Sequence, residues 1–146
     1  MKEPENGARP LCPSAQPGME GGVAFGVVGG TPEAPRLVHL TRALPVTDVL
    51  LALSGPVAPT EVFRFAAPCA GHSCQHFDGE DCRLVKRVVQ ILPAVADDTP
   101  PCTLRPSCRW WQQEGKAACA RCPQIVTESY APSEALTRAA DPKSPA

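Results

Sequence analysis

The chain has 146 residues, of which 43% are hydrophobic and 5% aromatic, and it carries a net charge of −1. This length suits one compact domain and excludes two hydrophobic cores of ordinary size. The balanced charge excludes a global electrostatic attraction to nucleic acids or anionic membranes. Because 18 prolines and 11 glycines interrupt regular structure, we expect metal ligation or disulfides to supply rigidity.

The N-terminal segment, residues 1–20, is polar and rich in proline, and it predicts a disordered tail. Cys12 lies within it and is interpreted as an unpaired thiol. The sequence contains neither the apolar run of a secretory signal nor the roughly 20 apolar residues that span a bilayer. We therefore expect a cytoplasmic protein whose thiols stay reduced, with no membrane contact.

Residues 21–67 predict a small apolar α/β subdomain. Its expected elements are a buried strand at 23–28 closed by Gly29-Gly30, a second strand at 36–40, a helix at 48–53 capped by Thr47, and a segment at 60–65 whose length fits either a helical turn or a strand. An apolar region of this size predicts packing against the rest of the chain.

Residues 68–128 predict two further helices within a cysteine-rich module. The first, at 81–92, has an apolar face that includes Cys82 and a polar face of Arg83, Lys86, Arg87 and Gln90. The second, at 108–114, is expected to begin with Cys108 after a Ser107 cap and to end at Gly115. Residues 129–146 predict a short helix and a flexible tail.

Seven cysteines in this module have the spacing Cys69-x4-Cys74-x7-Cys82 and Cys102-x5-Cys108-x10-Cys119-x2-Cys122. Buried cysteine is an ordinary small hydrophobic residue, but seven in proline-interrupted polar segments exceed what core packing requires. In a reducing compartment such clusters indicate metal ligands. The sequence therefore predicts a metal-binding module.

The ligand count divides these cysteines into two sets. Cys102, Cys108, Cys119 and Cys122 are expected to hold one cofactor. Cys69, Cys74 and Cys82 form a second set, with His76 as a possible fourth ligand, although His76 also fits an ordinary loop histidine. One cluster with spare thiols, and sites that mix the two sets, remain alternatives.

Iron is favoured over zinc by the spacing. Structural zinc sites draw ligands from close C-x2–4-C pairs, and only Cys119-x2-Cys122 is a clear pair of that kind. Iron–sulfur clusters accept thiolates at irregular spacing. The favoured cofactor is a [4Fe-4S] cluster, and zinc is the alternative.

Other chemistry finds little support. His39, His72 and His76 are the only histidines that could serve as the base in nucleophilic catalysis. His39 has no acidic residue near it in sequence, and a Cys/His pair with His72 or His76 would also need a third group to hold the base. The basic residues of the module are balanced by acidic ones, so they form no phosphate-binding stripe. The sequence does not favour an enzyme or a nucleic-acid-binding protein.

The predicted fold is α+β, small and irregular: a metal-stapled cysteine-rich domain with short helices and a small N-terminal subdomain that contains strands. The predicted function is a soluble iron–sulfur protein that transfers electrons or senses redox state for a partner protein. A zinc-stapled interaction module is the first alternative. An iron–sulfur-dependent accessory protein or regulator with weak nucleic-acid contact is the second.

Overall fold

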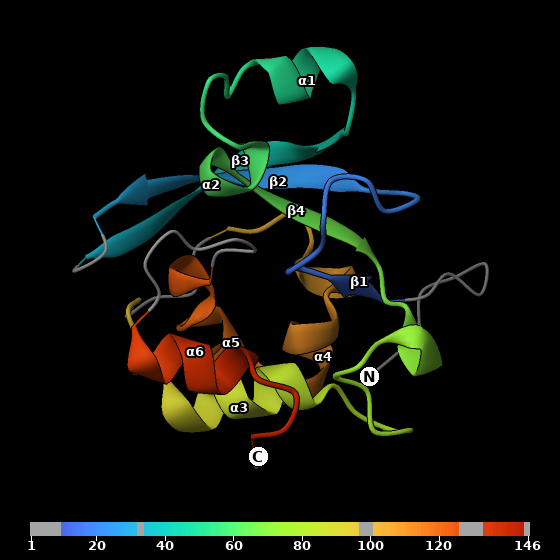
Figure 1. Ribbon diagram of the computed structural model, residues 1–146, viewed down its shortest axis with the longest axis vertical. Helices are drawn as coiled ribbons and strands as arrows, with labels where there is room; N and C mark the ends of the chain where they lie inside the picture. The colour runs from blue at the N-terminus through green and yellow to red at the C-terminus, as the bar shows by residue number, and fades with distance from the viewer. Residues whose placement is uncertain (1–9, 32–33, 97–100, 126–132, 145–146) are drawn as a thin grey trace.

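The computed structural model describes residues 10–31, 34–96, 101–125 and 133–144. A four-stranded antiparallel sheet forms its centre, in the order β1-β4-β2-β3. The strands are β1 (Leu11–Cys12), β2 (Val23–Gly30), β3 (Pro35–Pro45) and β4 (Phe63–Pro68). Short helices lie on both faces (Figure 1). The small, irregular α+β class predicted from the sequence is confirmed.

The two central strands follow the apolar segments of the sequence. The strands predicted at 23–28 and 36–40 both form, and each is longer than predicted. The glycine pair extends β2 to Gly30, where φ is +72° and an added Cβ would clash with the carbonyl oxygen of Ala34. A glycine is therefore required where the chain leaves β2, because this φ disfavours other residues.

On one face of the sheet lie α1 (Asp48–Ala52) and α2 (Pro59–Val62). The predicted cap is confirmed: Thr47 Oγ1 accepts a hydrogen bond from the Leu50 amide at 3.1 Å. The segment 60–65, for which the sequence left a helical turn and a strand open, contains both, since the one-turn α2 runs directly into β4. A small cluster of Ala24, Leu50, Phe63 and Phe65 fills this side.

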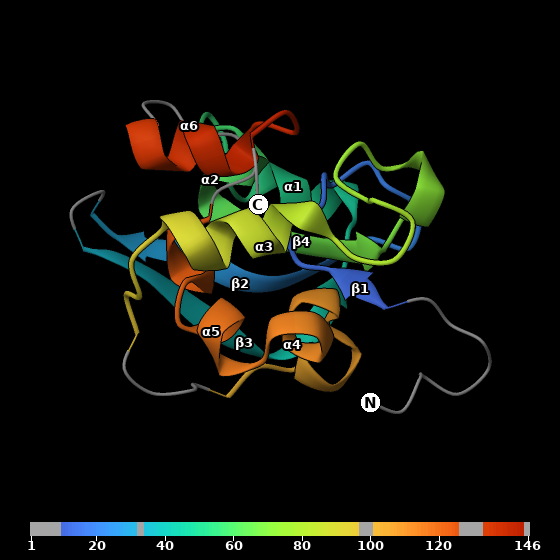
Figure 2. The ribbon, with the colours of Figure 1, turned by 90° about the horizontal axis from the view of Figure 1, so that it is seen from below.

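The opposite face is covered by four helices: α3 (Arg83–Ile91), α4 (Arg109–Glu114), α5 (Lys116–Cys119) and α6 (Glu134–Ala140). Figure 2 shows them in front of the sheet. Short 3₁₀ turns at Gly71–Ser73, Arg105–Ser107 and Cys122–Gln124 connect this layer. None of these helices, nor any other in the described ranges, has the length and apolar character needed to cross a membrane.

The main core lies between the sheet and these four helices. It combines side chains from sheet and helices, among them Phe25, Ala66, Val85, Trp110 and Ala139. The apolar segment 21–67 and the cysteine-rich segment 68–128 thus share one core. Of the cysteines in the second segment, Cys82 and Cys108 belong to this core, and Cys102 packs against it.

Both cysteine-bearing helices begin later than predicted. The helix expected at 81–92 starts at Arg83, and Cys82 is its N-cap residue. The helix expected at 108–114 starts at Arg109, so Cys108, and not Ser107, is the N-cap. Neither cysteine side chain makes a capping hydrogen bond. Both thiols therefore lie where helix N–H groups begin, which is the positive end of the helix dipole.

Arg87 is the second departure from the expected pattern. It was assigned to the exposed polar face of its helix, but its side chain is fully buried. The reason is α6, which packs on α3, and Arg87 Nε donates to the Ala139 carbonyl at 2.8 Å. A pattern read from one helix cannot show that a later helix covers its polar side.

Candidate metal centre

Cys12 is an ordered part of the sheet. Residues 10–20, expected within a disordered tail, include β1, in which Leu11 pairs with Pro68 and Cys12 with Ala67. The next residue after β4, Cys69, donates its amide N–H to the Pro10 carbonyl at 2.8 Å. Two cysteines that are 57 positions apart in sequence are thereby held on neighbouring strands. Residues 1–9 lie outside the described part of the chain.

One cavity is lined by four cysteines, Cys12, Cys69, Cys74 and Cys82, which we call the Cys12 group. Cys69 and Cys82 are buried, and the other two are partly buried. Burial is the main cause that raises the pKa of the Cys12 thiol to about 12, and the neighbouring thiols of Cys82, Cys69 and Cys74 add to the increase. This electrostatic coupling follows from the closeness of all four sulfurs.

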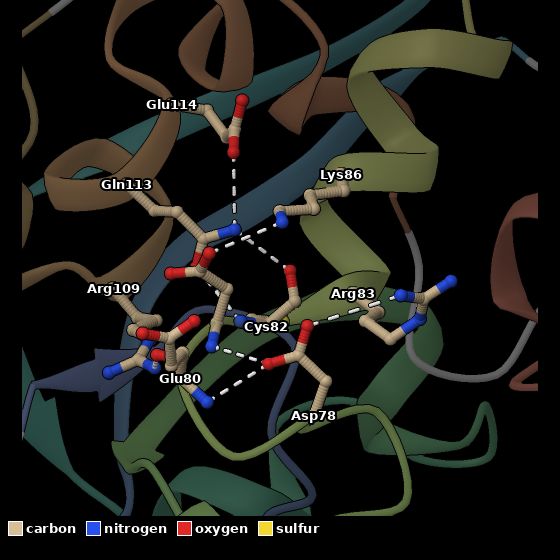
Figure 3. Close-up of polar contacts among 9 residues, drawn as sticks. Asp78, Glu80, Cys82, Arg83, Lys86, Arg109, Gln113 and Glu114 are labelled. Carbon is tan, nitrogen blue, oxygen red and sulfur yellow. Dashed lines mark hydrogen bonds and ion pairs between the residues drawn. The ribbon is translucent and has the colours of Figure 1, made fainter. Parts of the chain in front are cut away.

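Cys82 is held by a side chain from a different helix. Gln113 of α4 accepts from the Cys82 amide N–H at 2.9 Å and donates to the Cys82 carbonyl at 2.9 Å (Figure 3). The preceding loop is fixed by Asp78, whose carboxylate accepts from the amides of Glu80 and Asp81. Arg109 donates to the Glu80 carbonyl at 3.0 Å. The position of Cys82 is therefore set by α4 as well as by α3.

His76, the expected fourth ligand of this set, lies beside the cavity with its Nδ1 2.6 Å from Arg87 Nη2. Burial chiefly, and then the Arg87 charge, lower the pKa of His76. The arginine has only donors, so Nδ1 accepts its proton and is not available to a metal. The His76 amide N–H meanwhile donates to Cys74 Sγ at 3.4 Å.

A second cavity is lined by Cys102, Cys108, Cys119 and Cys122, the Cys102 group. This is the quartet predicted from the sequence. Cys102 lies in the loop before the 3₁₀ turn at Arg105–Ser107, and Cys108 is the N-cap residue of α4. Cys119 is the last residue of α5, and Cys122 begins a 3₁₀ turn. His39 of β3 lines the same cavity, and its buried Nδ1 has no hydrogen-bond partner in the described ranges.

Three thiols of the Cys102 group, those of Cys102, Cys108 and Cys119, resist ionisation. Burial raises the pKa of Cys108 to about 12, against the opposing effect of the Trp111 amide, and the Cys122 and Cys102 thiols raise it further. Burial is also the main cause that raises the pKa values of Cys102 and Cys119. A hydrogen bond from Arg105 opposes that increase at Cys119. Buried thiols of this kind need a cation in order to ionise.

Arg64 brings a positive charge to the Cys102 group from the middle of β4. It is fully buried, and its Nη2 lies 3.4 Å from Cys122 Sγ. Its Nη1 and Nη2 also donate to the carbonyls of Cys122 at 2.6 Å and Pro13 at 2.8 Å. Among the described residues, no ion pair involves Arg64, and its Nε has no partner. Burying a cation is costly unless a negative group compensates it.

The two cysteine groups are neighbours. Leu11 of β1 forms an isolated parallel bridge with Cys108, so one strand of two residues contacts the Cys102 group on one side and carries Cys12 to the other. Trp110, which is 1% exposed, lines both cavities. The bridge and the cysteine at position 12 keep the two groups within one small region of the core.

None of the eight cysteines is in a disulfide. As the described side chains stand, no group of three or more His, Cys, Asp or Glu residues is arranged to hold a metal ion. The thiols of each group share a cavity without converging on one point. Ligation would therefore require them to turn, which the single χ1 torsion of each cysteine allows.

Sequence reasoning missed Cys12, Arg64 and Arg87. Two signals were present: the eighth cysteine completes two sets of four, and Arg64 interrupts the otherwise apolar strand FRFAA. Two further arginines that lie next to cysteines in the sequence have other partners. Arg121 donates to the carbonyls of Leu92 and Ala117, and Arg109 lies over the Phe77 ring at 5.1 Å.

Each of the two groups therefore consists of four cysteines that line one cavity. Comparison with protein-family models, with curated proteins and with solved structures gives no match for the chain.

Proposed function

We propose that this protein is an iron–sulfur protein in which Cys102, Cys108, Cys119 and Cys122 hold a [4Fe-4S] cluster. The observation that carries the proposal is that these four cysteines line one cavity and that the buried Arg64 contacts one of them, Cys122, with its Nη2 3.4 Å from Sγ. A cluster with four thiolate ligands supplies the negative charge that a buried guanidinium requires. Ligation also removes the protons from thiols that burial keeps protonated.

Iron is preferred to zinc for two reasons. Cys102-x5-Cys108 and Cys108-x10-Cys119 are wider than a zinc knuckle, and thiolates from irregular turns are typical of iron–sulfur sites. Hydrogen bonds to the ligating sulfurs set the reduction potential of such clusters. The Arg64 guanidinium fits that role, since a positive charge near the cluster favours the reduced state.

The role we propose is electron transfer or redox sensing for a partner protein. The cluster takes up one electron from a reduced partner and gives it to an oxidised one, and no atoms are exchanged. Trp111 lines the cavity of the Cys102 group and limits the access of solvent and oxygen to the metal. A cytoplasmic location agrees with this chemistry and is part of the proposal.

The test is to purify the protein without oxygen, record its visible spectrum, and determine iron, acid-labile sulfide and zinc per chain. A brown sample with equal iron and sulfide supports the proposal. A colourless sample with stoichiometric zinc contradicts it and supports the alternative, a zinc-stapled interaction module, for which the Cys119-x2-Cys122 pair is the specific observation.

Four variants then test the ligands. Changing Cys102, Cys108, Cys119 or Cys122 to Ser should remove the same amount of iron in each case. His39→Ala is the matched control, because His39 lines the same cavity without belonging to the quartet. Iron that is lost in His39→Ala, or retained in any of the four cysteine variants, would show that the ligand set is wrong.

A further inference from the structure

We propose that Cys12, Cys69, Cys74 and Cys82 hold a second [4Fe-4S] cluster, with Cys12 in the position that the sequence suggested for His76. This inference deepens the proposed function and rests on it. Its basis is the shared cavity of the four cysteines and the sheet pairing that brings Cys12 to Cys69. A chain with eight cysteines can supply four thiolates to each of two clusters.

The backbone around this group is ordered for ligation. The pairing of β1 with β4 places Cys12 opposite Ala67, and the 2.8 Å hydrogen bond from the Cys69 amide to Pro10 continues the pairing by one step. Cys82 is fixed at the start of α3 by the two hydrogen bonds of Gln113. Three of the four proposed ligands thus have positions set by contacts that are distant in sequence.

A buried cation accompanies this group, as Arg64 accompanies the other. Arg87 is fully buried on α3, next to the helix start that carries Cys82, and its Nη1 has no hydrogen-bond partner within the described ranges. Neither ion pair found among the described residues involves Arg87. The acceptors of Arg87 are the Ala139 carbonyl and the His76 imidazole. Asp141 supplies part of the negative charge that this cation requires, and a thiolate-ligated cluster in the neighbouring cavity would add to it.

His76 is not a ligand in this proposal. Its Nδ1 accepts from Arg87 at 2.6 Å, and its amide N–H donates to Cys74 Sγ at 3.4 Å. The ring is therefore engaged with Arg87, and only the backbone of His76, which alanine at this position would keep, contacts a cysteine of the group. When the cluster binds, each of the four thiols loses one proton to solvent as its sulfur bonds to one iron.

The experiment counts iron and sulfide per chain in the full-length protein, purified without oxygen, and in Cys12→Ser, His76→Ala and Cys102→Ser. We expect about eight iron in the wild type and in His76→Ala, and about four in each cysteine variant. The iron that remains in Cys12→Ser must be lost when Cys102→Ser is added. Eight iron in Cys12→Ser, or four in His76→Ala, would overturn the assignment.

A second measurement uses only the wild-type protein, so it tests the proposal even if Cys12→Ser does not fold. The loaded wild-type protein is alkylated with iodoacetamide in its folded state, and again after the iron has been removed by a chelator and the chain unfolded in denaturant, because the folded chain itself partly buries Cys12. The modified cysteines are identified by mass spectrometry. Cys12 should react only after chelation, and its modification in the loaded protein would overturn the proposal. A wild type with four iron refutes the second cluster alone, whereas a wild type with none refutes the proposed function itself.

Discussion

Arg64 Nη2 lies 3.4 Å from Cys122 Sγ, and the same guanidinium donates to the Cys122 and Pro13 carbonyls. The side chain is fully buried and reaches across from β4 to the turn that holds Cys122. It thereby connects the sheet, the segment after Cys12 and Cys122 of the Cys102 group. The hydrogen bonds of this cation stabilise the surrounding packing, and its charge would stabilise the negatively charged cluster that we propose.

Arg64→Met should weaken both the packing around Arg64 and the proposed cluster. The methionine fills the space but leaves two buried carbonyls without donors, so we expect the free energy of unfolding to fall by about 3 kcal/mol or more. The reduction potential of the cluster should also become more negative, because a nearby positive charge is removed. Denaturant unfolding and a redox titration, both without oxygen, measure the two effects. The control is Arg42→Met on the exposed part of β3, and equal results for the two variants would contradict the role of Arg64.

Local signals predicted the elements that depend on local chemistry. The apolar run at Val23 formed β2, Thr47 capped α1 as expected, and Gly115 ended α4 with a φ of +65°. These features depend on side-chain periodicity, a hydroxyl acceptor and the conformational freedom of glycine. Each of these features is determined by a few consecutive residues of the sequence.

The parts that depend on distant contacts could not be predicted in this way. Cys12 has no apolar pattern around it, and it is ordered only because β4, more than 50 positions later, offers a free edge. Arg87 is buried only because α6 covers it. The Cys102 group was predicted from spacing alone, whereas the Cys12 group required the register of β1. Sequence spacing can group cysteines that follow one another along the chain, but it cannot group them with a cysteine that strand pairing brings from more than 50 positions away.

Gln113 offers a test of how Cys82 is positioned. Its side-chain amide matches the Cys82 N–H and carbonyl at once (Figure 3). Gln113→Glu keeps the acceptor but turns the donor into a second acceptor facing the carbonyl, so we expect a loss of about 1–3 kcal/mol in stability. Iron of the Cys12 group should also be lost first on chelation.

The matched control is Gln112→Glu. The Gln112 side chain donates only to the Pro106 carbonyl at an exposed position, so the change in stability should stay within about 0.5 kcal/mol. Denaturant unfolding and the rate of iron release to a chelator check both variants. Equal release rates for Gln113→Glu and the wild type would show that the amide does not position Cys82 for ligation.

Trp111 should protect the cluster of the Cys102 group from oxygen. Its ring lines that cavity and is covered by the Arg105 guanidinium, whose central carbon lies 5.4 Å from the ring centre. Trp111→Ala opens the cavity to solvent, so we expect the visible absorbance to decay several-fold faster in air, and Trp111→Phe should restore most of the protection. Lys116→Ala, an exposed change on the neighbouring α5, is the control. If the visible absorbance of Trp111→Ala decays in air at the same rate as that of the wild type, Trp111 does not shield the cluster.

The two proposed clusters should interact magnetically, because the two cysteine groups are close. Leu11 bridges directly to Cys108, and adjacent paired strands lie about 5 Å apart while successive Cα atoms are 3.8 Å apart. The Cα atoms of Cys12 and Cys108 are therefore within about 9 Å. Electron paramagnetic resonance of the fully reduced wild type should show broadened, spin-coupled signals. Cys12→Ser and Cys102→Ser should each give the simpler spectrum of one isolated cluster. If the wild-type spectrum equals the sum of the two variant spectra, the clusters do not interact, and the placement of both groups around β1 is wrong.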